Sequence, residues 1–120
     1  MEDYLFVKIK GEFTKLVFAD IIYIESWRNY VQIVTAKTKI MVKIGISKME
    51  KLLPPEEFFR IHRSYIVAAK AITGFNHNKV HLAHTDLPMS EQYRKALLTR
   101  IKTLEDSFTN ENGQDISLDH

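Results

Sequence analysis

Three polar clusters interrupt an otherwise β-rich sequence of 120 residues. They are WRNY (residues 27–30), RIHRS (residues 60–64) and PMSEQYRK (residues 88–95). Each cluster combines Arg or Lys with hydroxyl, amide or aromatic side chains. Guanidinium groups pair with phosphate oxygens or guanine, and Asn or Gln amides pair with adenine. Each cluster alone is more typical of a solvated turn, and three of them in one small basic domain shift that balance only moderately toward a nucleic-acid site.

The charge distribution points the same way. The net charge of the chain is +2, but residues 105–120 hold five acids and no Lys or Arg, which leaves residues 1–104 with a net charge of +7. A basic body favours a polyanionic partner, although evenly solvated surface charge is the alternative. The chain has no cysteine, which excludes disulfides and thiolate metal sites and is compatible with the cytoplasmic location that we expect.

Local sequence patterns predict a mostly β domain with two helices. Alternating or β-rich segments are expected to form strands at residues 5–10, 14–18, 21–26, 30–36, 40–44, 59–68, 71–75 and 80–84. Ser47 and Glu50 form a capping box that starts a short helix, with Ile46, Met49, Leu52 and Leu53 on its apolar face. Ser90 is expected to cap a final helix over residues 91–104.

The end of the chain differs from the rest. Residues 107–120 (SFTNENGQDISLDH) lack hydrophobic periodicity and carry only acidic charge. We therefore expect one domain over residues 1–106 and a disordered acidic tail over residues 107–120. No apolar run reaches the length of a membrane span, and MEDYLF is not a signal peptide, so we expect no membrane partner.

One long motif carries a family resemblance. FFRIHRSYIV (residues 59–68), with DIIYIES upstream and LPMSEQYRKALLTRI downstream, closely resembles the LytTR DNA-binding domain. That domain is usually the output module of bacterial LytR/AlgR-type response regulators in two-component systems. The resemblance covers residues 4–104, and the pattern F-x-R-x-H-R-S-[YF]-x-V followed by [I/L]-P-[V/M]-S is specific.

The resemblance implies a fold and a mode of binding. About ten short strands would form small antiparallel sheets, with one short mid-chain helix and a C-terminal helix. Loops at the sheet edges would enter successive major grooves of double-stranded DNA and read the direct repeats of a promoter. The domain would be a transcription regulator and no enzyme, without a cofactor or metal. It would be a monomer alone and bind DNA as two copies, downstream of a receiver domain and a sensor kinase.

Twelve residues are predicted to contact DNA. The resemblance assigns base reading to WRNY and to the residues after Ser90, and backbone contact to Arg63. The turn at residues 77–79 is expected to touch the DNA backbone. The full set is Arg28, Asn29, Tyr30, Arg63, Ser64, His77, Asn78, Lys79, Ser90, Gln92, Arg94 and Lys95. Many relatives carry Arg where this chain has Glu91, so either Gln92 reads the base or the base preference differs.

The remaining polar residues have structural interpretations. We expect His62 to hold a turn by hydrogen bonds and Arg60 to pair with Glu56 or Glu57 on the surface. Three histidines at positions 77, 81 and 84 invite a zinc hypothesis, but the last two point to opposite faces of a strand. Two other classes stay open: a protein- or peptide-binding β module that uses exposed strand edges, and a phosphodiesterase that uses His62 with Asp20 or Asp86.

Overall fold

Ten short strands and two helices form within residues 3–105, the part of the chain that this computed structural model describes. The strands are β1 (Tyr4–Ile9), β2 (Glu12–Val17), β3 (Ile21–Trp27), β4 (Tyr30–Thr35), β5 (Lys39–Val42), β6 (Phe58–His62), β7 (Tyr65–Ala68), β8 (Gly74–Phe75), β9 (Lys79–His81) and β10 (Asp86–Pro88). The helices are α1 (Ile46–Leu52) and α2 (Glu91–Leu98), and two 3₁₀ turns lie at Phe18–Asp20 and Ala69–Ala71. The predicted tail at 107–120 and the predicted domain end at 106 lie outside the described residues.

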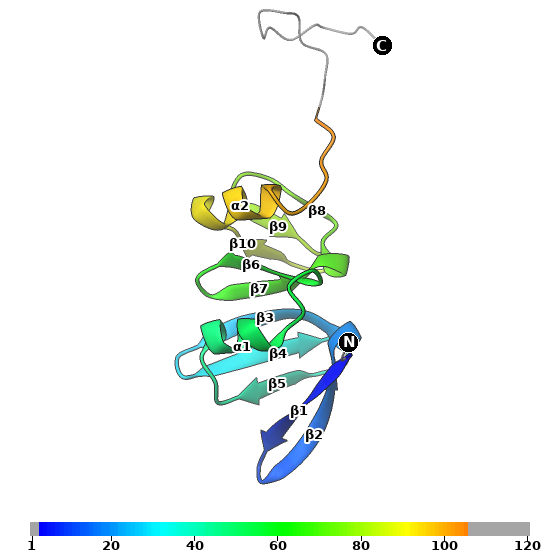
Figure 1. Cartoon of the computed structure of the whole chain (residues 1–120), viewed down its shortest axis with the longest axis vertical. Coiled ribbons are helices and arrows are strands. Elements are labelled where there is room, and N and C mark those ends of the chain that lie inside the picture. Colours follow the sequence, from blue (N-terminus) through cyan, green and yellow to red (C-terminus); the bar gives the residue numbers. More distant parts are fainter. Residues whose placement is uncertain (1–2, 106–120) are drawn as a thin grey trace, which may run out of the picture.

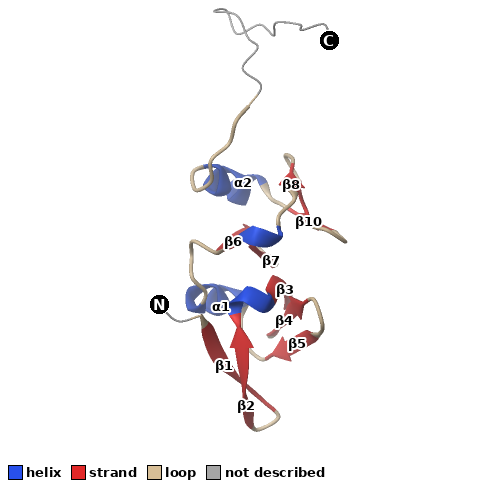
Figure 2. Cartoon of the chain, turned by 90° about the vertical axis from the view of Figure 1, so that its right-hand side faces the viewer, coloured by secondary structure: helices blue, strands red, loops and turns tan. Residues whose placement is uncertain are grey.

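The strands form three antiparallel sheets stacked along one long axis (Figure 1). The central sheet has the strand order β5-β4-β3-β7-β6, and β8, β9 and β10 form a second sheet beside α2. β1 and β2 form a separate hairpin that projects from the end of the stack (Figure 2). The expected mostly β architecture of small antiparallel sheets with two helices is confirmed.

The central sheet divides the hydrophobic core into two clusters because successive strand residues face opposite sides. Ile66 of β7 and Phe58 of β6 belong to the first cluster with Met49 of α1. Their neighbours Val67 and Phe59 belong to the second cluster, which Leu97 of α2 completes. The predicted core positions of the FFRIHRSYIV stretch, Phe59, Ile61, Tyr65 and Val67, all lie in or against the second cluster, whereas Ile66 belongs to the first.

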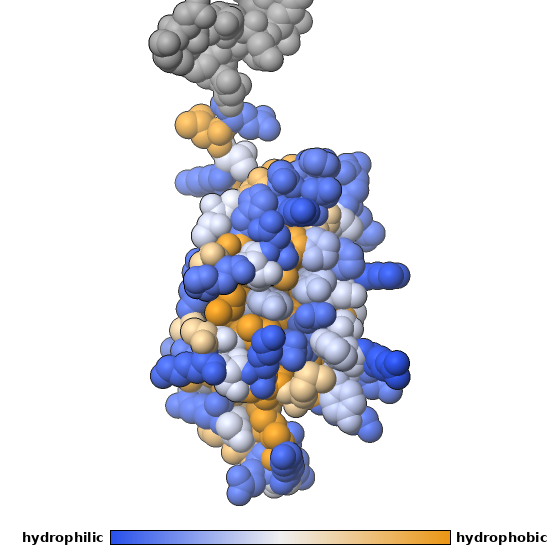
Figure 3. Space-filling model, turned by 180° about the vertical axis from the view of Figure 1, so that it is seen from behind, coloured by the Kyte–Doolittle hydropathy of each residue, from blue (hydrophilic) through white to orange (hydrophobic). Residues whose placement is uncertain are grey.

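The hairpin β1–β2 carries unusual exposed aromatic surface. Its turn uses Lys10 at φ 50° and Gly11 at φ 82°, a conformation that glycine adopts without strain. Phe6 and Phe13 on its outer face are 55% and 69% exposed. Seen from behind, a stripe of apolar surface runs down the molecule between polar flanks to this end (Figure 3).

Both helices differ in detail from the sequence prediction. The capping box at Ser47 is wrong: Gly45 is the N-cap of α1, and no side chain caps that helix. The early start places Ile46 in the core beside Met49, while Leu52 is 52% exposed and not on the buried face. Helix α2 ends at Leu98 and not at residue 104, with Thr99 as its C-cap.

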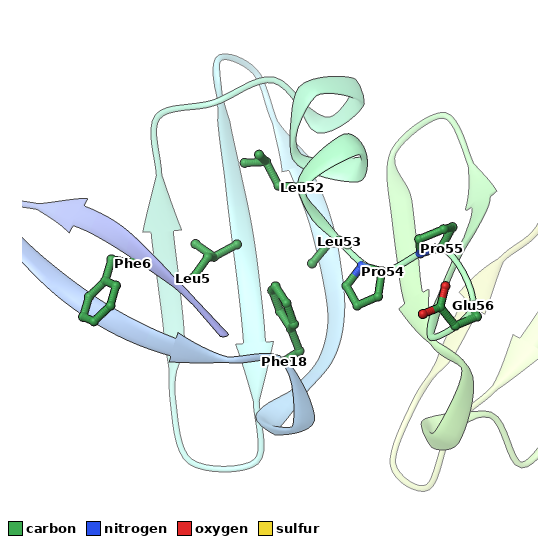
Figure 4. A pocket seen from close by; sticks show the side chains of 8 residues that line it. All are labelled: Leu5, Phe6, Phe18, Leu52, Leu53, Pro54, Pro55 and Glu56. Atoms are coloured by element: carbon green, nitrogen blue, oxygen red, sulfur yellow. The ribbon is translucent and has the colours of Figure 1, made fainter. Parts of the chain in front are cut away.

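A hollow of about 440 Å³ lies between the hairpin and the end of α1 (Figure 4). Its lining is apolar except for Glu56, which gives it a single carboxylate and no partner for acid–base chemistry.

Neither helix in the described part of the chain is long and apolar enough to cross a membrane.

Candidate nucleic-acid interface

Four polar segments meet at one edge of the molecule because antiparallel strands bring alternate turns to the same end. Three of the segments, the β3–β4 turn, the β6–β7 turn and the start of α2, lie on the left side of the stack (Figure 1). The fourth segment is the β8–β9 turn. Three backbone hydrogen bonds join the segments across the sheets. They are Ser26 N to Ser64 O at 2.8 Å, Ser90 N to Ile61 O at 3.0 Å and Met89 N to Asn78 O at 2.8 Å.

The β3–β4 connection is a two-residue turn formed by Arg28 and Asn29. Trp27 and Tyr30 lie opposite each other in the strand register and close it. Arg28 has φ 56°, a left-handed conformation that costs a non-glycine residue roughly 1–2 kcal/mol. All four side chains are exposed, so a guanidinium, an amide and two rings project together into solvent. This set can donate to phosphate, pair with a base edge and touch a thymine methyl group.

The side chain of Arg60 stabilises the β6–β7 turn by hydrogen bonds to two backbone carbonyls. The Arg60 Nε donates to His62 O at 2.8 Å, and Nη2 donates to Arg63 O at 2.5 Å. The third arm, Nη1, forms an ion pair with Glu50 of α1 at 2.8 Å. The prediction of a surface pair with Glu56 or Glu57 is wrong, since only 9% of the Arg60 side chain is exposed.

Arg60 also explains what the turn can present. Arg60 binds the backbone carbonyls of His62 and Arg63. The side chain of Arg63 is exposed. Ser64 is half-buried, and its carbonyl accepts the hydrogen bond from Ser26. Sequence reasoning missed the role of Arg60 because its carboxylate partner lies ten residues upstream, at a spacing that no local pattern reveals.

His62 closes the same turn, as predicted from its position. Its Nδ1 accepts a hydrogen bond from Ser64 N at 3.1 Å, and its ring meets that of Tyr65 edge-on, 5.7 Å between centroids. Burial, followed by the charges of Arg63 and Arg60, lowers the pKa of His62 from its usual 6.5. The neutral ring is therefore the form that accepts the Ser64 hydrogen bond.

The β8–β9 turn is organised by one amide side chain. Asn76 Oδ1 accepts hydrogen bonds from Asn78 N at 3.0 Å and Lys79 N at 2.9 Å. This local bonding fixes the turn and leaves the side chains of His77, Asn78 and Lys79 exposed. The predicted trio is thus presented together, next to the residues that precede α2.

At the start of α2, Ser90 occupies the N-cap position, as predicted, but its hydroxyl makes no capping hydrogen bond. Gln92 and Lys95 are exposed, whereas Arg94 is half-buried. Arg94 Nη2 lies 2.9 Å from Glu91 Oε1 in an ion pair within the first turn. Of the twelve predicted residues, nine have exposed side chains, and Ser64, Ser90 and Arg94 are half-buried.

The geometry does not assemble the alternative sites. His81 Nδ1 lies 2.8 Å from Asp86 Oδ1, so Asp86 partners that histidine and not His62. Asp20 lies in the 3₁₀ turn before β3, at the end of that strand opposite the β3–β4 turn. Within residues 3–105, no three His, Cys, Asp or Glu side chains are grouped as metal ligands would be.

A comparison with protein families identifies the family of this domain. Residues 11–102 match the model of the LytTr DNA-binding domain. The chain belongs to the LytTR DNA-binding domain family. The resemblance inferred from FFRIHRSYIV is thereby confirmed, and so is the expectation of a DNA-binding domain.

Individual relatives support the assignment of this LytTR domain. A LytTr DNA-binding domain from Bacillus cereus has the same fold, with a TM-score of 0.69 and 20% sequence identity over 82% of this chain and 96% of that one. The CO-responsive transcriptional regulator RcoM of Rhodospirillum rubrum is 36% identical over 66 residues, which are 54% of this chain. The LytTR chain matches 28% of the length of RcoM.

Proposed function

We propose that this LytTR domain binds double-stranded DNA sequence-specifically by inserting its edge turns into the major groove. It would act as the output domain of a bacterial transcription regulator in the cytoplasm. The β3–β4 turn and the first turn of α2 would read bases, and Arg63 would contact phosphate between them. Two copies would occupy a promoter with direct repeats, while the protein without DNA would be monomeric.

The observation that carries this proposal is the single edge on which the four polar segments converge. Of the twelve predicted residues, five are Lys or Arg: Arg28, Arg63, Lys79, Arg94 and Lys95. Backbone hydrogen bonds between the segments fix the spacing of these groups before DNA arrives. A preorganised row of cations and amides suits a groove flanked by phosphates, because less ordering is needed on binding.

The regulatory setting is a further part of the proposal. RcoM is by its name a transcriptional regulator, and we extend that general role to this chain. We do not extend its response to CO, since the match covers only 28% of RcoM. The upstream partners that we propose are a receiver domain and a sensor kinase, with the LytTR domain as their output.

The test is binding of the purified protein to labelled duplexes at several salt concentrations. If four to six phosphates are neutralised, the plot of log affinity against log salt should have a slope of about −4 to −5, at roughly 0.9 per phosphate. A selection from a random duplex library should then enrich one sequence, and sedimentation on a duplex with two copies of it should show two proteins bound.

A matched control comes from the opposite end of the same sheet. Lys37 lies in the β4–β5 connection, which antiparallel pairing places away from the β3–β4 turn. Lys37→Ala removes one positive charge, as a change at Arg63 does, and should leave the salt slope unchanged. Absence of binding at low salt, or a slope near zero, would contradict DNA binding and favour a protein-binding role.

A further inference from the structure

Two charged side chains in the first turn of α2, Glu91 and Arg94, form an ion pair, and Glu91 is the more exposed of the two. Its side chain is 64% exposed, whereas that of its partner Arg94 is 27% exposed. Glu91 is also the residue next to Ser90, whose backbone N–H binds Ile61 O and so fixes the helix start to the central sheet. At the edge proposed to bind DNA, the carboxylate is therefore more accessible to solvent than the guanidinium.

The carboxylate is held in place by a hydrogen bond on one side only. Oε1 accepts from Arg94 Nη2 at 2.9 Å, and no donor within residues 3–105 bonds to Oε2. The Nε of Arg94 is buried, without a hydrogen-bond partner among the described residues, so part of this guanidinium faces the protein. The other carboxylate oxygen of Glu91 is left as an acceptor without a protein donor among the described residues.

The surrounding cations allow this carboxylate to approach DNA. The hydrogen bond and charge of Arg94 lower the pKa of Glu91, and the charges of Lys95 and His77 act in the same direction. The same positive groups that stabilise the ionised carboxylate offset its repulsion by phosphates. Glu91 is thus an ionised acceptor placed inside a basic edge.

An ionised carboxylate can accept hydrogen bonds but cannot donate them. In the major groove cytosine presents only the N4 amino donor, whereas guanine O6 and thymine O4 are acceptors and adenine places the acceptor N7 beside its N6 donor, where it repels a carboxylate. We propose that Glu91 is a specificity-determining residue of this domain and accepts a hydrogen bond from the N4 amino group of a cytosine. This inference rests on the proposed function, because it requires the start of α2 to lie in the major groove.

The experiment compares sequences selected from a random duplex library by the wild type, Glu91→Ala, Glu91→Gln and Arg94→Ala. The wild type should require cytosine at one position. Glu91→Ala should lower the preference for that cytosine by about 5- to 150-fold, the range expected for one base contact. Glu91→Gln should shift the same position toward adenine, which pairs with an amide through N6 and N7. Arg94→Ala should weaken binding but still select cytosine there.

Glu12→Ala is the matched control, since Glu12 is an exposed carboxylate on the hairpin β1–β2 and its loss changes net charge equally. This control should keep the wild-type sequence preference. An unchanged preference in Glu91→Ala, or a guanine preference that disappears equally in Glu91→Ala and Arg94→Ala, would overturn the inference while DNA binding stands. If the wild type binds no duplex at low salt, the proposed function itself fails.

Discussion

The guanidinium of Arg60 lies 2.8 Å from the carboxylate of Glu50, and this ion pair joins β6 to helix α1. The same guanidinium bonds the carbonyls of His62 and Arg63 and lies 5.5 Å from the ring centroid of Tyr93 in α2. One side chain therefore connects both helices to the turn that presents Arg63.

Replacing Arg60 should destabilise the fold. Arg60→Met keeps the length of the stem but leaves two carbonyls and Glu50 without their donor, which should lower the free energy of unfolding by about 2–4 kcal/mol. Glu50→Gln should cost only about 0.5–1 kcal/mol, because Glu50 is 44% exposed. Urea unfolding measures both. Equal midpoints for Arg60→Met and the wild type would show that the arginine does not hold the turn.

Arg63 tests the contact with the DNA backbone. Arg63→Ala should weaken specific and random duplexes alike and make the salt slope shallower by about one unit, because phosphate contacts carry no sequence information directly. Its backbone carbonyl, which Arg60 binds, is unaffected, so the melting temperature should stay within a few degrees of the wild type. Unfolding of this variant would instead mean that RIHRS is only a structural turn.

Asn29 tests base reading. Asn29→Ala should leave random-duplex affinity and the salt slope nearly unchanged, but should cost about 1–3 kcal/mol on the selected site. The loss should appear at one base-pair position, which a competition series with single-base changes can locate. If Asn29→Ala lowers the affinity for random duplexes as much as Arg63→Ala does, the β3–β4 turn contacts phosphate, and the other segments must read the bases.

His62 should make stability depend on pH. Because its folded pKa lies below the usual 6.5, the unfolded chain takes up a proton first as the pH falls. The contribution of His62 to the free energy of unfolding is therefore fully present above pH 6.5 and decreases as the pH falls from 6.5 toward the folded pKa. His62→Asn retains an acceptor for Ser64 N and should lack this decrease. Urea titrations at pH 7.5 and 5.5 compare the two proteins, and identical pH dependence would contradict the assignment.

The acidic tail should be dispensable for folding. Deletion of residues 107–120 removes three acids, at positions 111, 115 and 119, and no basic residue. The melting temperature should therefore change by no more than a few degrees, and random-duplex affinity should rise slightly or stay level. A large drop in melting temperature would place the domain boundary beyond residue 106.

Most strand positions could be predicted from the sequence, because most short strands have their own alternation and are bounded by turns. The exceptions are residues 59–68, which form the two strands β6 and β7, and β10, for which no strand was predicted. Helix ends could not be predicted. Helix α2 stops at Leu98, where Arg100 reaches back to the carbonyl of Pro55 and lies 4.7 Å from the ring of Phe59. The helix ends there although the apolar pattern continues to Leu104, and no Gly or Pro near Thr99 signals the stop.

In the candidate site, too, some features could be predicted from the local sequence and others depend on contacts between distant segments. The turn residues Asn29 and Arg63 were identifiable because polar groups between strands leave a local trace in the sequence. The pairing of Glu91 with Arg94 has helical spacing, but its significance depends on which partner is more exposed, and only the fold determines that. The support of the β6–β7 turn by Arg60 required the three-dimensional structure.

An edge made of turns has a consequence for how such a regulator could change its target. An exposed turn side chain that makes no hydrogen bond or ion pair can usually be replaced with a change of about 0.5 kcal/mol or less in the free energy of unfolding. The preferred operator could therefore diverge while folding is unaffected. Asn29, His77 and Gln92 are exposed side chains of this kind. Arg28 is the exception in one respect, since at φ 56° glycine would be less strained and a β-branched residue more so. If these turns read the operator, as we propose, new operators would be reached most readily by substitution at Asn29, His77 and Gln92, with the backbone conformation of Arg28 kept.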